Sequence, residues 1–253
     1  MNNVDIALTT CMTNGKAIDA DVLAGITRNT ALYGFVDDPS HLEQDQIYVL
    51  SARNDTVVDR MVVQKLQEYY LNFIDNPHEQ IRAVYDVDGE HSQLTKNYGN
   101  PCTRLGSPYI NDCNYDAAGA ILQHIFQGKL NEPKTLSYTG KIYKFNQAAF
   151  VDGPIWSESF GLNPTGAVYV PTQCQDGRKT CILHVALHGC EMNFELIQEQ
   201  YVEHSGYNAW ADANDMVILY PQVCKSAVFT LNCFRYWLFL SLCIAGTFKR
   251  LKS

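Results

Sequence analysis

Short runs of apolar residues that end at turn-forming residues recur along the chain. Four of them have the length and composition of β-strands: residues 47–52, 81–87, 182–187 and 216–220. Residues 61–73 carry apolar and aromatic side chains at helical spacing, and residues 196–213 have the aromatic and small-residue pattern of a helix. Strands that alternate with helices predict a three-layer α/β fold around a mostly parallel sheet.

Residues with catalytic chemistry follow three of these strands. Asp55 lies just past the first strand, His91 lies in the loop after the second, and the turn His188-Gly189-Cys190 follows the third. Open parallel sheets bind ligands at the carboxyl ends of their strands. We therefore take Asp55, His91 and this turn as the candidate site.

The composition of the chain fits one globular domain. Its 253 residues are 46% hydrophobic, which is enough for one α/β domain with a sizeable core. Its 19 basic and 27 acidic side chains give a net charge of −8. The sequence has no basic patch that would bind nucleic acid, so we expect no nucleic-acid partner.

Nine cysteines are many for a cytosolic protein. Cys102 is close to Cys113 in sequence, and Cys174 to Cys181, which predicts two short disulfide-closed loops and an oxidising compartment. The cysteine spacings match no zinc module. The first residues show neither the basic region nor the apolar run of a signal peptide, and we interpret this conflict as a lost N-terminus.

Asp55 and His91 follow the chain order of the last two members of an α/β-hydrolase triad, which runs Ser, Asp, His. In such a triad the carboxylate fixes the imidazole tautomer, and it stabilises the imidazolium that forms when the histidine takes the serine proton. Simpler interpretations remain for both residues. An aspartate often follows a strand by chance, and a single histidine in a loop is usually a solvated surface residue.

The His188-Gly189-Cys190 turn resembles the H-G turn of hydrolases, in which a backbone N–H faces the developing oxyanion. Because this turn follows His91 in the chain, the interpretation requires a circularly permuted sheet. One alternative is a plain glycine turn after a buried strand. Another is a metal site of His184, His188 and Cys190, but two histidines four positions apart on a strand lie about 13 Å apart at ~3.3 Å per residue, too far to share an ion. We expect no metal.

Several longer stretches resemble extracellular poly(3-hydroxybutyrate) depolymerases. Residues 161–174 read GLNPTGAVYVPTQC, residues 176–181 read DGRKTC and residues 183–190 read LHVALHGC. The resemblance continues through YNAWAD at 207–212, VILYPQ at 217–222, DCNYDAAG at 112–119 and VLSARNDTV at 49–57. It covers about residues 5–223 and is closest to the circularly permuted, single-domain type of this family.

The resemblance implies a function and a role for each candidate residue. Asp55 matches the triad acid, His91 matches the triad histidine, and the backbone N–H of Cys190 matches an oxyanion-hole donor. Members of this family are extracellular, bind polyester or short 3-hydroxybutyrate oligomers, and cleave the ester through an acyl-enzyme without a metal or organic cofactor. We also expect Cys11 and Cys224 to lack their disulfide partners.

Two features of the chain depart from the family. The sequence contains no G-x-S-x-G motif, which would carry the nucleophile; the nearest pattern, Ser157-Glu-Ser159-Phe-Gly161, lacks the first glycine. The C-terminal stretch switches to an apolar composition. We therefore expect residues 1–223 to form a partial α/β-hydrolase domain without the nucleophile strand and elbow, and residues 224–253 to be a divergent tail outside the family fold.

The tail has two interpretations. Residues 227–248 could associate with a membrane, but Asn232 and Arg235 interrupt them. The uninterrupted apolar run, residues 236–248, is shorter than the roughly 20 residues that cross a bilayer. We favour a truncated or misread gene product over a membrane anchor or an interaction helix.

Three functions stay open. We favour a fragmentary polyester depolymerase that is inactive in this form. The alternatives are a non-catalytic polymer-binding protein that retains the docking face, and a working esterase that uses another nucleophile or a serine from a partner chain. Usual element and loop lengths place the missing serine a few tens of codons before Met1, behind a signal peptide.

Overall fold

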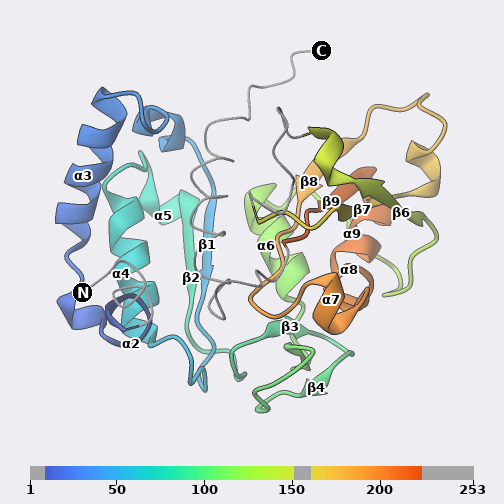
Figure 1. Ribbon diagram of the computed structural model, residues 1–253, viewed down its shortest axis with the longest axis horizontal. Helices are drawn as coiled ribbons and strands as arrows, with labels where there is room; N and C mark the ends of the chain where they lie inside the picture. Colours follow the sequence, from blue (N-terminus) through green and yellow to red (C-terminus); the bar gives the residue numbers. More distant parts are fainter. Residues whose placement is uncertain (1–8, 151–160, 224–253) are drawn as a thin grey trace. The chain divides into compact units, whose positions relative to one another are not determined.

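The structure, a computed structural model, describes residues 9–150 and 161–223. Its helices and strands fall into two compact units. Residues 9–91 belong to unit 1, and the described residues from 92 to 223 belong to unit 2. Figure 1 labels the elements of both units.

Unit 1 combines two parallel strands with helices. In chain order it contains α2 (Thr10–Thr13), the 3-10 helix η1 (Gly15–Ala17), α3 (Ala20–Leu32), η2 (Pro39–Leu42), β1 (Ile47–Leu50), α4 (Arg60–Leu71), α5 (Pro77–Gln80) and β2 (Ile81–Val84). β1 and β2 pair in parallel, with Ile47 opposite Ile81 and Leu50 opposite Val84. The chain passes through α4 between these strands, and α4 packs against β1 and α3 (Figure 1). Such a crossover is what parallel strands require.

Aspartates start the two long helices of unit 1. The carboxylate of Asp19 accepts hydrogen bonds from the N–H groups of Asp21 and Val22 at the start of α3. The carboxylate of Asp59 accepts one from the N–H of Met61 at the start of α4. These N–H groups have no partner inside the first helical turn, so each aspartate stabilises its helix end.

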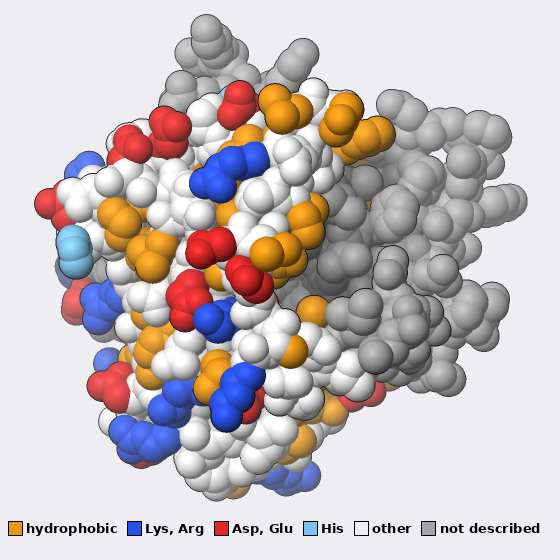
Figure 2. Space-filling model, turned by 90° about the vertical axis from the view of Figure 1, so that its left-hand side faces the viewer, with side chains coloured by type: hydrophobic (Ala, Val, Ile, Leu, Met, Phe, Trp, Pro, Cys, Tyr) orange, Lys and Arg blue, Asp and Glu red, His pale blue; other side chains and the backbone are white. Residues whose placement is uncertain are grey.

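The outer side of α3 is partly apolar. Ala20 and Ala24 of this helix are buried, whereas Val22, Ile26 and Tyr33 are exposed on the helix and at its end. Figure 2 shows the face on which α3 lies, where orange apolar side chains are scattered among blue and red charged ones. Apolar side chains scattered in this way are ordinary on a protein surface.

Unit 2 contains two sheets and the helices packed against them. Its elements are β3 (Gln93–Thr95), β4 (Asn100–Pro101), β5 (Ile110–Asp112), α6 (Ala117–Ile125), β6 (Lys141–Asn146), η3 (Gln147–Phe150), β7 (Thr165–Val170), η5 (Thr172–Cys174), β8 (Ile182–Val185), α7 (Phe194–Ile197), α8 (Gln200–His204), α9 (Tyr207–Ala213) and β9 (Met216–Tyr220). β5 lies between β3 and β4 in a short parallel sheet. The larger sheet has the order β6-β7-β9-β8, in which β8 and β9 are parallel and β7 is antiparallel to β6 and β9.

The structure has the expected α/β class, but its sheets differ from the expected arrangement. The described strands pair in three sheets rather than one, and β7 contributes antiparallel pairs. The apolar pattern does not predict β6, because most of its side chains are exposed and its sequence therefore lacks an apolar run. Strand pairing depends on contacts between distant segments, which the run of apolar residues in one strand does not specify.

Three of the four expected strands end early. β1 ends at Leu50, β2 at Val84 and β8 at Val185, whereas β9 has the expected bounds. The residues that follow each shortened strand are apolar or continue the alternation, so the sequence pattern extends the expected strand over them. A strand continues only where its backbone pairs with a neighbouring strand, and apolar side chains alone do not ensure that pairing.

The prediction of a single helix at residues 196–213 is wrong. The structure has three short helices there, α7, α8 and α9. Gln198 follows α7 with a φ of 55°, and Gly206 precedes α9 with a φ of 99°. These left-handed φ values interrupt a right-handed helix, so the apolar periodicity continues across two breaks in the backbone.

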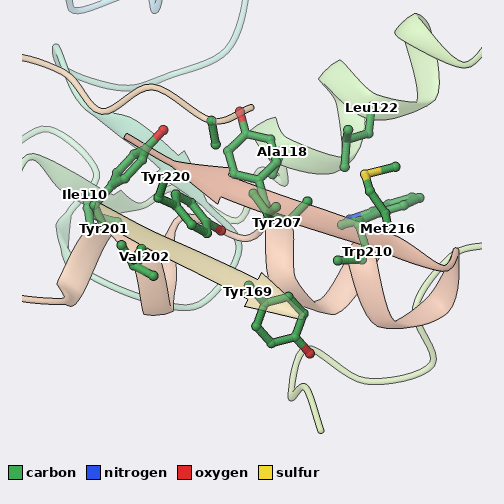
Figure 3. Packing of buried hydrophobic residues seen from close by; sticks show 14 of the residues in the cluster. Ile110, Ala118, Leu122, Tyr169, Tyr201, Val202, Tyr207, Trp210, Met216 and Tyr220 are labelled. Carbon is green, nitrogen blue, oxygen red and sulfur yellow. The ribbon is translucent and has the colours of Figure 1, made fainter. Parts of the chain in front are cut away.

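The core of unit 2 is rich in tyrosine. Tyr201 and Tyr220 are 4% and 0% exposed, and Figure 3 shows them packed among the other core side chains. Tyr201 O–H donates to the carbonyl of Leu187 at 3.0 Å, and Tyr220 O–H donates to Asn208 Oδ1 at 2.7 Å. Because each buried hydroxyl has a partner, these residues add packing area without leaving a polar group unsatisfied.

Both disulfides that the cysteine spacing predicts are present. Cys102 is bonded to Cys113, and Cys174 is bonded to Cys181. Cys11 is exposed and forms no disulfide with another described cysteine. Each bond closes a short loop of unit 2, which restricts the unfolded chain.

Several expectations lie outside the described residues. These are the serine-containing stretch 157–160, Cys224 and the apolar tail 224–253. Within residues 9–150 and 161–223, no helix is long and apolar enough to cross a membrane.

Two glycines in helices test the packing. An ideal Cβ on Gly119 of α6 would lie 2.5 Å from Cζ2 of Trp210 and 2.6 Å from Oδ2 of Asp116, the N-cap residue of that helix. Gly119→Ala should therefore lower the free energy of unfolding by about 1–3 kcal/mol, although alanine favours helix by about 1 kcal/mol. Urea unfolding of purified protein measures this change.

Gly25→Ala in α3 is the matched control. An added Cβ on Gly25 has no atom within 4 Å, so this substitution should raise the free energy of unfolding by about 0.5–1 kcal/mol. Equal stabilisation by Gly119→Ala and Gly25→Ala would contradict the packing of α6 against Trp210.

Candidate active site

The loops after β1 and β2 run together beyond the ends of the two strands. Asn54 N–H donates to the carbonyl of Gly89 at 3.0 Å, which continues the contact between the two segments past the sheet. Asp55 comes next in the first loop, and His91 lies two positions after Gly89 in the second. Parallel pairing of β1 with β2 thus places the acid and the histidine side by side.

Asp55 divides its two carboxylate oxygens between the backbone and His91. Oδ1 accepts hydrogen bonds from Val57 N–H at 2.9 Å and Val58 N–H at 2.8 Å. Oδ2 lies 2.9 Å from Nδ1 of His91. An ionised carboxylate carries no proton and only accepts hydrogen bonds, so Nδ1 of the ring is the donor. Nε2 is then the ring atom that can take up a proton.

The electrostatics of the pair favour its ionised form. The hydrogen bond to Asp55 raises the pKa of His91 above its ordinary value, against the opposing effect of burial. Burial alone would raise the pKa of Asp55, but hydrogen bonds from His91 and from backbone N–H groups outweigh it, so the pKa of that carboxyl is lowered. The side chain of Asp55 is 11% exposed and that of His91 is 46% exposed, so the acid is covered while the base faces outward.

Glu90 also belongs to this arrangement, although the sequence pattern does not single it out. It is 5% exposed, and its carboxylate accepts hydrogen bonds from Thr56 and from the N–H of His91. What marks Glu90 is its burial, which the structure shows and the sequence does not.

The His188-Gly189-Cys190 turn, called the His188 turn below, is fixed by the His188 ring. Nδ1 of His188 lies 2.7 Å from the carbonyl oxygen of Gly189, and Nε2 accepts a hydrogen bond from Val223 N–H at 3.3 Å. These partners require a proton on Nδ1 and none on Nε2, so the ring is neutral. Burial also lowers the pKa of His188, which is 3% exposed.

The ring of His188 acts on the peptide group of the candidate oxyanion donor. The carbonyl of Gly189 and the N–H of Cys190 belong to one planar peptide unit. A hydrogen bond to that carbonyl therefore fixes the direction of the N–H on the other side of the unit. It also polarises the unit, which strengthens the N–H as a donor.

Two tyrosines hold the ends of the His188 turn. Tyr201 donates to the carbonyl of Leu187, before the turn, at 3.0 Å. Tyr109 donates to Oε2 of Glu191, after the turn, at 2.5 Å, and Glu191 has a φ of 59°. A left-handed φ in a residue other than glycine is unfavourable, and these contacts help to maintain it.

The described residues contain no cluster of metal ligands. Across residues 9–150 and 161–223, no group of three or more His, Cys, Asp or Glu side chains could hold a metal ion. His184 lies against the ring of Tyr207, with the ring centroids 5.3 Å apart, and burial lowers its pKa.

Comparisons with known proteins find depolymerases that are similar to this chain. No family model matches it. Poly(3-hydroxybutyrate) depolymerase of Delftia acidovorans is 39% identical over 229 residues, which are 90% of this chain and 44% of that protein. Polyhydroxybutyrate depolymerase of Talaromyces funiculosus is 37% identical over 186 residues, 72% of this chain and 52% of that protein. The chain spans about half the length of these curated relatives.

Solved structures agree with the sequence relatives. The crystal structure of PHB depolymerase from Penicillium funiculosum aligns with a TM-score of 0.74 and 32% identity, over 85% of this chain and 65% of that chain. In sequence and in fold, the chain is similar to poly(3-hydroxybutyrate) depolymerases. A serine-to-alanine variant of a PHB depolymerase, complexed with R3HB trimer, aligns with a TM-score of 0.75 and 33% identity over the same shares of both chains.

These similarities confirm the resemblance to depolymerases that the motifs of the sequence indicate, together with the α/β fold. The circular permutation stays a prediction. The same holds for the roles of Asp55 as acid, His91 as base and Cys190 as oxyanion donor.

A pH titration followed by NMR should separate the two histidines. His91 should titrate above the ordinary value of 6.5 because it gains a carboxylate partner, and His188 should titrate below it because it is buried as a neutral ring. Signals assigned by His→Gln variants would identify each residue. The reverse order of the two pKa values would contradict both environments.

Asp55→Asn should lower the pKa of His91, because it removes the partner that raises it. The raised pKa of His91 contributes stability that is complete below 6.5 and is lost as pH rises through the folded-state pKa. The lowered pKa of Asp55 contributes stability that is complete above 3.8 and is lost as pH falls through the folded-state pKa.

The stability difference between the parent and Asp55→Asn should therefore be largest between pH 3.8 and 6.5 and should shrink on both sides. Urea unfolding across this pH range measures it. A difference that does not depend on pH would show that the pair is not ionic.

Proposed function

We propose that this chain supplies the acid, the base and one oxyanion donor of a serine esterase that cleaves 3-hydroxybutyrate polyester and its short oligomers. The observation that carries the proposal is the contact of 2.9 Å between Asp55 Oδ2 and His91 Nδ1. Asp55 is held by two backbone N–H groups and covered, while His91 is about half exposed. A fixed carboxylate behind an accessible imidazole is what acyl transfer to a serine requires.

Each residue has a defined role in the proposed reaction. A serine hydroxyl attacks the ester carbonyl and passes its proton to Nε2 of His91, and Asp55 stabilises the imidazolium. The N–H of Cys190 donates to the oxyanion of the tetrahedral intermediate. His91 then gives the proton to the departing alkoxide, which leaves an acyl-enzyme, and water releases the acid by the same steps in a second round.

We propose that the nucleophile is a serine outside these 253 residues. They contain no G-x-S-x-G motif, and they match only part of the length of their relatives. We propose that the acid and base act with a serine carried by a longer form of the protein. The permuted chain order, with the His188 turn after His91, belongs to the same proposal.

The substrate class rests on the relatives. Both curated relatives are named for the hydrolysis of polyhydroxybutyrate, and one solved structure combines a serine-to-alanine replacement with a bound R3HB trimer. The two disulfides support maturation in an oxidising, extracellular setting. No step of the proposed reaction needs a metal or an organic cofactor.

The 253-residue chain should hydrolyse short 3-hydroxybutyrate esters no faster than its His91→Ala variant. Without a serine for His91 to deprotonate, the acid–base pair has no reaction to assist. Product release from methyl 3-hydroxybutyrate dimers, compared between the two proteins, measures this.

A rate that depends on His91 would mean that another nucleophile is present, and a serine-reactive phosphonate would then label it. Adsorption to polymer by a serine-containing longer form that releases no product would instead favour a non-catalytic polymer-binding protein.

A further inference from the structure

Glu90 joins the two loops that carry Asp55 and His91. Its Oε1 accepts hydrogen bonds from Thr56 N–H at 2.7 Å and from His91 N–H at 2.7 Å, and its Oε2 accepts one from the Thr56 hydroxyl at 3.0 Å. The residue is 5% exposed. A glutamate this deeply buried is rare unless it is well satisfied, and these three donors satisfy it.

The partners of Glu90 are the neighbours of the catalytic pair in sequence. Thr56 follows Asp55 directly, and Glu90 precedes His91 directly. Backbone hydrogen bonds and an ion pair already join the two loops. Next to the catalytic pair, two further side-chain ties join them, the contact of Asp55 with His91 and the contacts of Glu90 with Thr56. Together the two ties close a small ring of covalent and hydrogen bonds around the pair.

We propose that Glu90 is a positioning residue that sets the separation of Asp55 and His91 and holds the His91 backbone in place. The catalytic meaning of this role rests on the proposed function. The role itself is a property of the folded chain and is testable without catalysis.

The physical need for such a residue follows from exposure. The His91 side chain is 46% exposed, so packing restricts its rotamers only in part. Its position depends on the backbone at residue 91 and, among the described residues, on the hydrogen bond with Asp55. When Glu90 holds the N–H of His91, the imidazole starts from a fixed backbone and less order has to be imposed during the reaction.

A carboxylate suits this position better than an amide. The hydrogen bonds described above are donated to Glu90 by Thr56 and His91, and an ionised carboxylate only accepts. Glutamine could still accept both N–H bonds through its amide oxygen and donate to the Thr56 hydroxyl, but it would lose the charge that strengthens these bonds. The negative charge has a second effect, because Glu90, together with Asp55, raises the pKa of His91.

The test compares Glu90→Gln with Glu79→Gln in the 253-residue protein. Glu79 is an exposed glutamate of α5 in the same unit, so its replacement removes the same charge away from the pair. NMR measures the pKa and the tautomer of the His91 ring, and hydrogen exchange measures the N–H groups of Thr56 and His91.

Glu90→Gln should lower the pKa of His91 and increase the fraction of rings without a proton on Nδ1. It should also speed exchange of the Thr56 and His91 N–H groups by roughly tenfold relative to other protected N–H groups of unit 1, because their hydrogen bonds lose the assistance of the charge. Glu79→Gln should change none of these values.

Thr56 variants test the same tie from the other loop. Thr56→Val removes the hydroxyl that donates to Oε2 and should speed exchange at His91, whereas Thr56→Ser keeps a hydroxyl and should restore the parent values. This pair decides the question if Glu90→Gln does not fold.

A change in unfolding free energy with unchanged His91 pKa, tautomer and N–H exchange would overturn the proposal and leave Glu90 a merely structural residue. If the NMR changes occur but no form of the protein cleaves esters, Glu90 positions the pair as proposed and the esterase function fails by itself.

Discussion

The carboxylate of Asp55 is the interaction on which the account of the site depends. One oxygen is held by two backbone N–H groups of its own loop, and the other reaches the ring of His91. The parallel pairing of β1 and β2 makes this contact possible, because it brings both strand ends to one edge. Glu90 adds a further tie between the same two loops. Local turn chemistry and strand pairing therefore produce an ionic pair with one covered and one accessible partner.

The His188 turn of unit 2 uses a different device, a neutral buried histidine. Its ring is fixed between the Gly189 carbonyl and the Val223 N–H, so it orients the peptide group that carries the N–H of Cys190. One histidine is thus kept ready to take a proton and the other is kept from taking one. Burial and a carboxylate partner are sufficient to produce these opposite tendencies in one chain.

The sequence predicted those parts of the molecule that depend on local signals. The strand at residues 216–220, the disulfide pairs and the positions of Asp55 and His91 after strands follow from apolar runs, short cysteine spacings and turn formers. The breaks at Gln198 and Gly206, the pairing of β7 and the burial of Glu90 depend on contacts between distant segments, which one sequence does not reveal. The resemblance to depolymerases was inferred from long sequence motifs and not from the physical chemistry of single residues.

The central claim is that Asp55 and His91 are the acid and base of a serine esterase, and a longer form of the protein that carries a G-x-S-x-G elbow tests it most directly. The measurement is kcat/KM for short 3-hydroxybutyrate esters, for this form and for its Asp55→Asn variant. The account predicts hydrolysis that falls by roughly 10³–10⁴-fold in the variant, the usual loss when the imidazole tautomer is no longer fixed. Hydrolysis at the same rate in both proteins, or none in either, would contradict it.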